Sequence, residues 1–124
     1  MRETPSFSWS LFLQWVLAAT LAWLVGAPLG NGLAVGLTLG LAQWLVLRPL
    51  VDRPNRWILL TAAGWTLAFL LASTAGVEGV FAGIVLGAVT GFAQWLALRE
   101  WYRLSGWWIA ASTVGWGLGL AGFL

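Results

Sequence analysis

The stretch Gly40-Leu-Ala-Gln-Trp-Leu-Val-Leu-Arg48 recurs as Gly91-Phe-Ala-Gln-Trp-Leu-Ala-Leu-Arg99, and this repetition predicts the arrangement of the chain. The offset between the copies is 91 − 40 = 51 residues, and it extends without a gap to earlier and later matches such as Gly32 with Gly83. Each of these nine-residue elements forms the C-terminal end of one apolar stretch, and a second apolar stretch follows it in the sequence. One repeat is therefore a pair of helices, and two copies with the same orientation form a parallel repeat.

Five apolar stretches flank or contain these elements, and a helix needs ~20 residues to cross a bilayer. Their approximate ranges are 9–25, 30–47, 57–75, 79–98 and 106–124. Pro28, Pro49 and Pro54 lie in the breaks, because proline does not continue a helix interior. The sequence predicts an all-α integral membrane bundle of five transmembrane helices, in a single domain over 1–124. We divide it into a half repeat (1–28), repeat one (about 30–75) and repeat two (about 79–124).

The first helix reads as a degenerate copy of the third, with Trp15 in register with Trp65. Tryptophans near the predicted helix ends are expected to form an aromatic belt at the membrane surface, since indole favours that interface. They include Trp9, Trp57, Trp101, Trp107 and Trp108.

Composition and charge support a membrane location and give an orientation. The chain is 60% hydrophobic and 8% charged, whereas soluble domains carry about 25% charged residues. With five spans, all the arginines fall on one face of the membrane; they are Arg2, Arg48, Arg53, Arg56, Arg99 and Arg103. Because short basic loops stay in the cytoplasm, we expect the N-terminus inside and the C-terminus outside.

Several function classes are disfavoured by what the sequence lacks. It contains no cysteine and no histidine, which removes thiolate metal sites and the usual acid/base group at neutral pH. No carboxylate is predicted within the bilayer, and no phosphate-binding loop is present. We therefore expect neither an enzyme nor a metal site. The few charges also argue against a nucleic-acid partner.

Glycines at four-residue spacing mark one face of the second and fourth helices, where they allow close approach of another helix. The stripes are Gly32, Gly36 and Gly40, and Gly83, Gly87 and Gly91. We expect these helix-packing residues to bring the second and fourth helices against each other near a pseudo-twofold axis. Alternatively, the groove receives a flat ligand such as a pigment, a quinone or a lipid tail.

Gln43 and Gln94 fall on the glycine faces, two helical turns from the glycines before them. A side-chain amide in hydrocarbon needs a partner, so the two either clamp the helices together or hold a ligand. Trp44 with Arg48 and Trp95 with Arg99 are i,i+4 pairs at the predicted cytoplasmic ends. They either anchor the helices at the interface or bind an anion. These six residues are the candidates for a cofactor site.

The doubled Gly-x-Ala-Gln-Trp-Leu-x-Leu-Arg element, followed by Trp-Ile and Gly-Trp, resembles a group of small uncharacterised bacterial polytopic membrane proteins. The resemblance covers 32–65 and 83–116. It implies a bacterial inner membrane, either cytoplasmic or photosynthetic. It brings no activity, cofactor or site residue.

Three functional hypotheses remain open. The first is a non-enzymatic membrane subunit that packs through glycine-faced helices, with itself or with a larger membrane complex. The half repeat favours it, because the first helix lacks a repeat-mate and one flank would be completed by another chain. The second is a small oligomeric channel or transporter for an ion or a solute. The third is a protein that binds a lipid, pigment or quinone.

Overall fold

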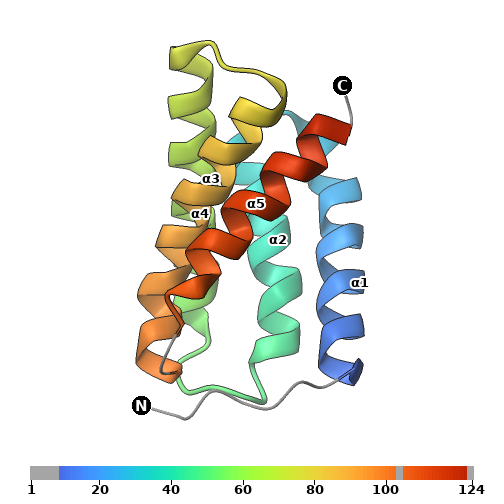
Figure 1. Cartoon of the computed structure of the whole chain (residues 1–124). Coiled ribbons are helices and arrows are strands. Elements are labelled where there is room, and N and C mark those ends of the chain that lie inside the picture. Colours follow the sequence, from blue (N-terminus) through green and yellow to red (C-terminus); the bar gives the residue numbers. More distant parts are fainter. Residues whose placement is uncertain (1–8, 103–104, 123–124) are drawn as a thin grey trace.

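The computed structural model describes residues 9–102 and 105–122, and all regular structure within them is helical (Figure 1). The elements in order are α1 (Trp9–Gly26), the short 3₁₀ helix η1 (Ala27–Leu29), α2 (Gly32–Leu47), α3 (Asn55–Ala75), α4 (Gly79–Trp101) and α5 (Trp107–Gly122). The all-α prediction with five long helices is therefore confirmed. Arg2 and Arg103 lie outside the described residues.

Local signals explain where the helices begin and end. Asn31 precedes α2 with an extended backbone, and its Oδ1 accepts a hydrogen bond of 2.8 Å from the Ala34 N–H. This cap satisfies one of the donors that a helix start leaves open. Gly76 ends α3 with a φ of 69°, a left-handed conformation that glycine adopts without a Cβ penalty. The turn to α4 therefore needs very few residues.

Consecutive helices pack side by side along the chain, from α1 on α2 through to α4 on α5. Figure 1 shows α5 crossing the front of the bundle, with α1 at the opposite flank from α3 and α4. The expectation that the second and fourth helices pack against each other is wrong, because no backbone contact joins α2 and α4 in the described chain. Each glycine stripe instead faces the helix that follows it.

Three segments are long and apolar enough to cross a membrane: Trp9–Leu29, Asn55–Ala75 and Gly79–Trp101. The other two long helices, α2 and α5, have 16 residues each. Large apolar side chains cover the outer surface, such as Leu59 and Leu118, which are each 70% exposed. A surface of this kind suits hydrocarbon rather than water.

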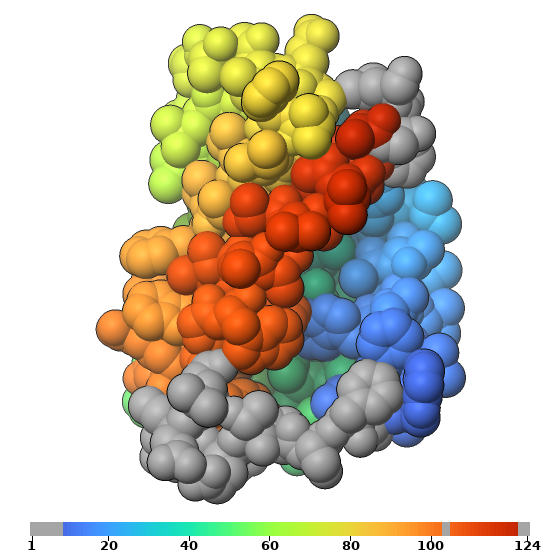
Figure 2. All heavy atoms as spheres, viewed as in Figure 1, coloured from blue at the N-terminus to red at the C-terminus, as the bar shows by residue number. Residues whose placement is uncertain are grey.

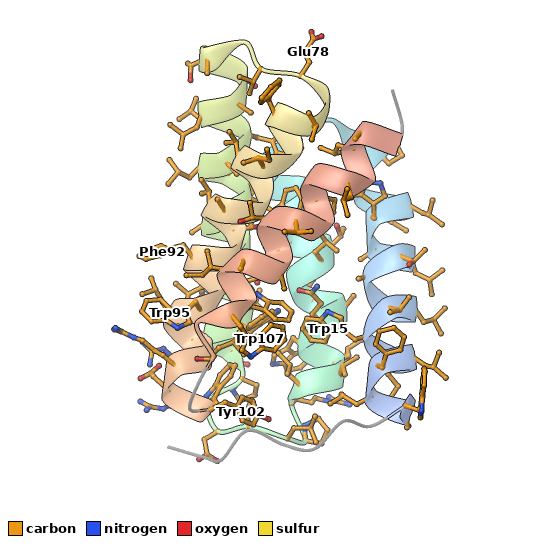
Figure 3. All side chains as sticks on the ribbon, in the orientation of Figure 1. Trp15, Glu78, Phe92, Trp95, Tyr102 and Trp107 are labelled. Carbon is orange, nitrogen blue, oxygen red and sulfur yellow. The ribbon has the colours of Figure 1, made fainter. Side chains whose placement is uncertain are left out.

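The arginine-bearing loops and the turn at Glu78 lie at opposite ends of the bundle. Figure 3 shows Glu78 at one end and Tyr102 and Trp107 toward the other. Trp57 and Trp101 do not belong to an aromatic belt, since they are 0% and 4% exposed within a buried cluster. The helices around them cover the indole rings, which was not evident from their place near helix ends.

Candidate functional site

The six glycines of the two stripes lie where another backbone comes close. A Cβ added at Gly36 would lie 2.7 Å from the Ala62 Cα, and one added at Gly87 would lie 2.6 Å from the Thr113 Cα. Real Cβ atoms do not approach this closely, so α2 on α3 and α4 on α5 both depend on glycine. The remaining four glycines show the same pattern, Gly32 and Gly40 against α3 and Gly83 and Gly91 against α5.

These contacts recur at the sequence offset of 51. A Cβ added at Gly40 would lie 3.3 Å from the Ile58 Cα, and one added at Gly91 would lie 3.2 Å from the Ile109 Cα. Ala62 and Thr113, which face Gly36 and Gly87, are also 113 − 62 = 51 residues apart. The two hairpins thus pack with equivalent residues in equivalent contacts.

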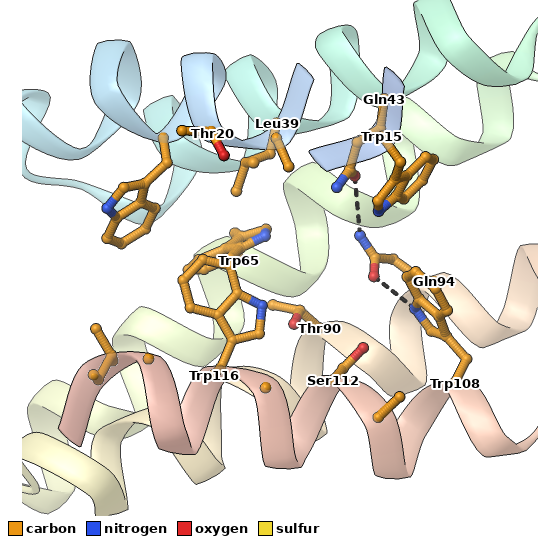
Figure 4. Close-up of a pocket in the computed structure, with 16 residues that line it drawn as sticks. Trp15, Thr20, Leu39, Gln43, Trp65, Thr90, Gln94, Trp108, Ser112 and Trp116 are labelled. Carbon is orange, nitrogen blue, oxygen red and sulfur yellow. Dashed lines mark hydrogen bonds between the residues drawn. The ribbon is translucent and has the colours of Figure 1, made fainter. Parts of the chain in front are cut away.

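Gln43 and Gln94 meet in the interior, and each accepts a hydrogen bond from a tryptophan N–H. Figure 4 shows the link between the two glutamines and the one between Gln94 and Trp108. Trp57 Nε1 donates to Gln43 Oε1 at 3.0 Å, and Trp108 Nε1 donates to Gln94 Oε1 at 2.9 Å. Gln94 Nε2 donates to Gln43 Oε1 at 3.5 Å and to Thr61 Oγ1 at 3.2 Å. Although α2 and α4 do not touch through their backbones, their glutamine side chains link them.

Two layers of indole rings join α1, α3 and α5. In one layer Trp15 lies 5.6 Å from Trp57 and 5.8 Å from Trp108, measured between ring centroids. The other layer consists of Trp23, Trp65 and Trp116, with centroid separations of 5.9, 5.0 and 4.8 Å. Such tilted and edge-on contacts are favourable for aromatic rings.

The tryptophan contacts show that the predicted register of the first helix relative to the third is wrong. Trp15 contacts Trp57, not Trp65, so α1 and α3 match at an offset of 57 − 15 = 42. The same offset relates Trp23 to Trp65. The correct register could have been found in the sequence, because α1, α3 and α5 each have two tryptophans eight positions apart. The offset of 51 between repeat one and repeat two drew attention away from this spacing.

A cavity of about 410 Å³ lies between the indole layers and opens between α1 and α5. Figure 2 shows the corresponding hollow between these two helices, with α2 at its base. All five long helices contribute to its lining. Its principal side chains are Trp15, Trp23, Gln43, Trp65, Thr90, Gln94, Trp108, Ser112 and Trp116. The sequence did not indicate that Thr90 and Ser112 belong to this site.

The cavity offers more hydrogen-bond donors than the described chain satisfies. Gln43 is only 7% exposed, yet its Nε2 has no acceptor among the described residues. The Nε1 atoms of Trp15, Trp65 and Trp116 likewise meet no acceptor in the part of the chain that the structure describes. No fully buried side-chain nitrogen or oxygen of the described residues lacks a hydrogen-bond partner, so these N–H groups face the open cavity and not packed protein. The cavity therefore suits a group that brings oxygen acceptors.

The tryptophan–arginine pairs lie away from this cavity. The guanidinium of Arg48 sits 5.3 Å from the Trp44 ring centroid, and that of Arg99 sits 5.4 Å from the Trp95 ring centroid. Each pair is confined to its own helix, and Figure 3 shows Trp95 pointing outward. In the described residues no contact joins the two pairs, so their geometry favours two separate interfacial anchors over one anion site.

Glu100 connects the loop after α2 to the end of α4. It forms an ion pair with Arg56, and Arg53 Nη2 lies 3.9 Å from Glu100 Oε1. These side chains are partly or largely exposed, so the pairing joins the loops without forming an enclosed charged site.

No known family model, curated protein or solved structure matches this chain.

Proposed function

We propose that the protein is a non-enzymatic membrane subunit whose five helices all cross the bilayer and which docks to a partner through the opening between α1 and α5. The observation that carries this proposal is the uncovered seam between α5 and α1. Every pair of consecutive long helices is in backbone contact, whereas no backbone contact joins α5 and α1 in the described chain. The rings of Trp15 and Trp23 on α1 reach those of Trp108 and Trp116 on α5 across this seam. Between α5 and α1, a surface of small residues and indole rings that resembles a helix-packing interface is left uncovered.

The position of this interface differs from the one expected from the glycine stripes. Gly36 and Gly87 face α3 and α5 of their own chain, so they are not available to another subunit. Gly115 and Gly119 of α5 line the cavity instead, and a Cβ added at either would meet nothing within 4 Å. The docking surface therefore lies on α5 and α1.

Orientation follows from the same arrangement. The described arginines lie in the loops and helix ends at one end of the bundle, and Glu78 lies in the turn at the other. Because basic loops stay in the cytoplasm, the Arg56–Glu100 end faces inward. The open seam then runs within the membrane, where a partner helix or a hydrophobic ligand reaches it laterally.

The native mass of the protein, gently extracted from its own membranes, tests this function. We expect a particle that contains other polypeptides, and we expect Gly115→Leu to release them, since a side chain would then fill the open face. Ala110→Leu makes a similar change on α5 at a residue outside the cavity lining and serves as the control. A wild-type particle containing a single chain would contradict the proposal, as would identical particles from both variants.

A second candidate function is the binding of a small planar molecule, and the unpaired donors of Gln43 and Trp15 favour it. A quinone or pigment carbonyl would accept from Gln43 Nε2 while its ring lay against the indoles. This candidate predicts a bound small molecule in the native preparation that is lost in Gln43→Leu. A colourless particle that releases only bulk lipid on solvent extraction would argue against it.

A further inference from the structure

We propose that the seam between α5 and α1 is a sixth helix position, filled by a transmembrane helix of a partner protein that runs in the direction of α2 and α4 and brings a glutamine to the level of Gln43 and Gln94. This inference rests on the proposed function and names the element of the partner that docks. The order of the helices, the two walls of the groove and the hydrogen bonds of the glutamines support it.

The first is the order of the helices around the bundle. The tryptophan-bearing helices α1, α3 and α5 meet through the two indole layers. Helix α2 packs on both α1 and α3, and α4 packs on both α3 and α5. The third groove, between α5 and α1, holds no helix in the described chain. Three tryptophan helices in mutual contact define three outer grooves, and two of them are filled.

The face of α5 that lines this groove is equivalent to the face of α3 that α4 covers. Gly64 of α3 lies against α4, since a Cβ added there would be 2.8 Å from the Ala93 Cβ and 3.3 Å from the Thr90 Cα. Its equivalent in α5, at the offset of 51, is Gly115, where an added Cβ would meet nothing. Gly119 is equally open one turn later. The surface that receives α4 is thus present a second time without a helix on it.

The α1 wall shows the same vacancy. The glycine stripe of α2 lands on Ile58 and Ala62 of α3, as that of α4 lands on α5. At the offset of 42, Val16 and Thr20 of α1 correspond to Ile58 and Ala62. Val16 is 44% exposed, and Thr20 is exposed as well. Because small residues let helices approach closely in membranes, an incoming helix with glycines at four-residue spacing fits this wall.

The hydrogen bonds of the tryptophans and glutamines indicate that the incoming helix carries a glutamine. Trp57 and Trp108 each donate to a glutamine of the preceding outer helix, whereas Trp15, the third member of their layer, has no acceptor in the described chain. Gln94 Nε2 donates to Gln43 Oε1, whereas Gln43 Nε2 has no such acceptor. A glutamine carbonyl in the third groove would accept from both.

The remaining atom of that glutamine also has a partner. Gln94 Nε2 donates to Thr61 Oγ1 of α3, and Ser112 of α5 occupies the position equivalent to Thr61 at the offset of 51. Ser112 lines the cavity. The hydroxyl of Ser112 is therefore placed to accept from the amide nitrogen of the incoming glutamine.

A partner protein fits this position better than a second copy or a small ligand. The stripes of α2 and α4 are already packed on their own chain, so a second copy would have to open a hairpin to supply either helix. A small molecule would satisfy the donors of Trp15 and Gln43 but leave the open glycines of α5 bare. A helix accounts for both observations.

The probe for this inference is a synthetic peptide with the sequence of α4, Gly79–Trp101, because this helix already fills an equivalent groove. The full chain is placed in lipid nanodiscs, and peptide binding is followed by energy transfer between labels on the two. We expect saturable binding. A Gln94→Leu peptide should bind about threefold or more weakly, since interhelical hydrogen bonds in membranes are worth ~0.6–1.7 kcal/mol.

Variants of the full chain locate the binding. Gly115→Leu should weaken it about tenfold or more by filling the groove, because tight packing is lost along the whole contact. Trp15→Phe should weaken it by a smaller factor than the Gln94→Leu peptide does, since it removes only one of the hydrogen bonds that the incoming glutamine forms. Ala110→Leu, outside the cavity lining, should leave it unchanged.

Three outcomes would overturn the inference: no saturable binding, binding that Gly115→Leu and Trp15→Phe leave intact, or native particles in which a second copy of this chain crosslinks across α1 and α5. Absence of peptide binding together with a native particle that contains other subunits would leave the proposed function standing and remove only the sixth helix. A native particle holding one chain and one small molecule would contradict both.

Discussion

The seam between α4 and α5 and the seam between α5 and α1 are both lined by glycine, yet only the first is closed. At Gly87 an added Cβ would run into the backbone of Ser112 and Thr113, whereas at Gly115 it would meet open space. Glycines at four-residue spacing thus indicate that another helix can approach closely. They do not indicate whether the approaching helix belongs to the same chain. The contrast between the two seams gives a set of measurable differences.

The largest difference should come from filling each seam with leucine. Gly87→Leu places a side chain against the backbone of α5, so we expect a loss of about 3 kcal/mol or more, at the upper end of overpacking effects. Gly115→Leu should change the stability of the isolated protein by less than about 0.5 kcal/mol. Reversible unfolding by sodium dodecyl sulfate in mixed micelles measures both. Equal losses would show that the two seams are alike.

The next difference concerns hydrogen bonding of the indoles. Trp108→Phe removes a donor from Gln94, whereas Trp15→Phe removes a donor that has no acceptor in the described chain. Both substitutions shorten the ring to the same extent. We therefore expect Trp108→Phe to be the more destabilising by about 1 kcal/mol in the same unfolding assay. If Trp15→Phe proved equally costly, Trp15 would have an acceptor within the isolated chain.

A smaller difference should separate the two equivalent glycines Gly64 and Gly115. Gly64→Ala brings a methyl group to 2.8 Å from the Ala93 Cβ, so α3 and α4 must shift apart, at a net loss of about 1 kcal/mol. Gly115→Ala should be neutral or slightly stabilising, because alanine is the better helix former and space is available. Thermal unfolding of both variants in one detergent compares them. A loss at Gly115 would mean that the groove is filled in the isolated protein.

The smallest effect should lie at the loop end, away from both seams. Glu100→Gln removes the ion pairs with Arg56 and Arg53. Exposed ion pairs contribute little, so we expect a change within about 0.5 kcal/mol that disappears in high salt. Glu78→Gln in the opposite turn, where no ion pair is found among the described residues, is the matched control. A loss above about 1 kcal/mol that persists in salt would show that the loops hold the bundle together.

Much of the architecture was predictable from the sequence because it depends on local signals. Pro28, Pro49 and Gly76 interrupt apolar stretches, and these breaks gave the helix order and approximate bounds. The repeated Gln-Trp element also placed Gln43 and Gln94 on inward faces, where they do meet. Each of these features is decided within one or two helical turns.

The partners of each face were not predictable, because they depend on which helices become neighbours. The stripes at Gly36 and Gly87 were assigned to each other, although each one packs on the next helix. Trp15 was aligned with Trp65, whereas its ring contacts Trp57, eight residues earlier. The stretch from Trp23 to Gly32 spans 32 − 23 = 9 residues and the equivalent stretch from Trp65 to Gly83 spans 83 − 65 = 18, so one offset does not serve both copies. The cavity itself arises only when all five helices are in place.

The indole layers also depend on three helices that are far apart in the sequence. Each layer takes one ring from α1, one from α3 and one from α5, so neither layer is complete until α5 has packed. A nascent chain that stops before Trp107 has both α2 and α4 but only two rings of each layer. Because closely spaced indoles couple their electronic transitions, we expect the near-ultraviolet circular dichroism of the tryptophans to differ between such a shortened chain and one that includes α5.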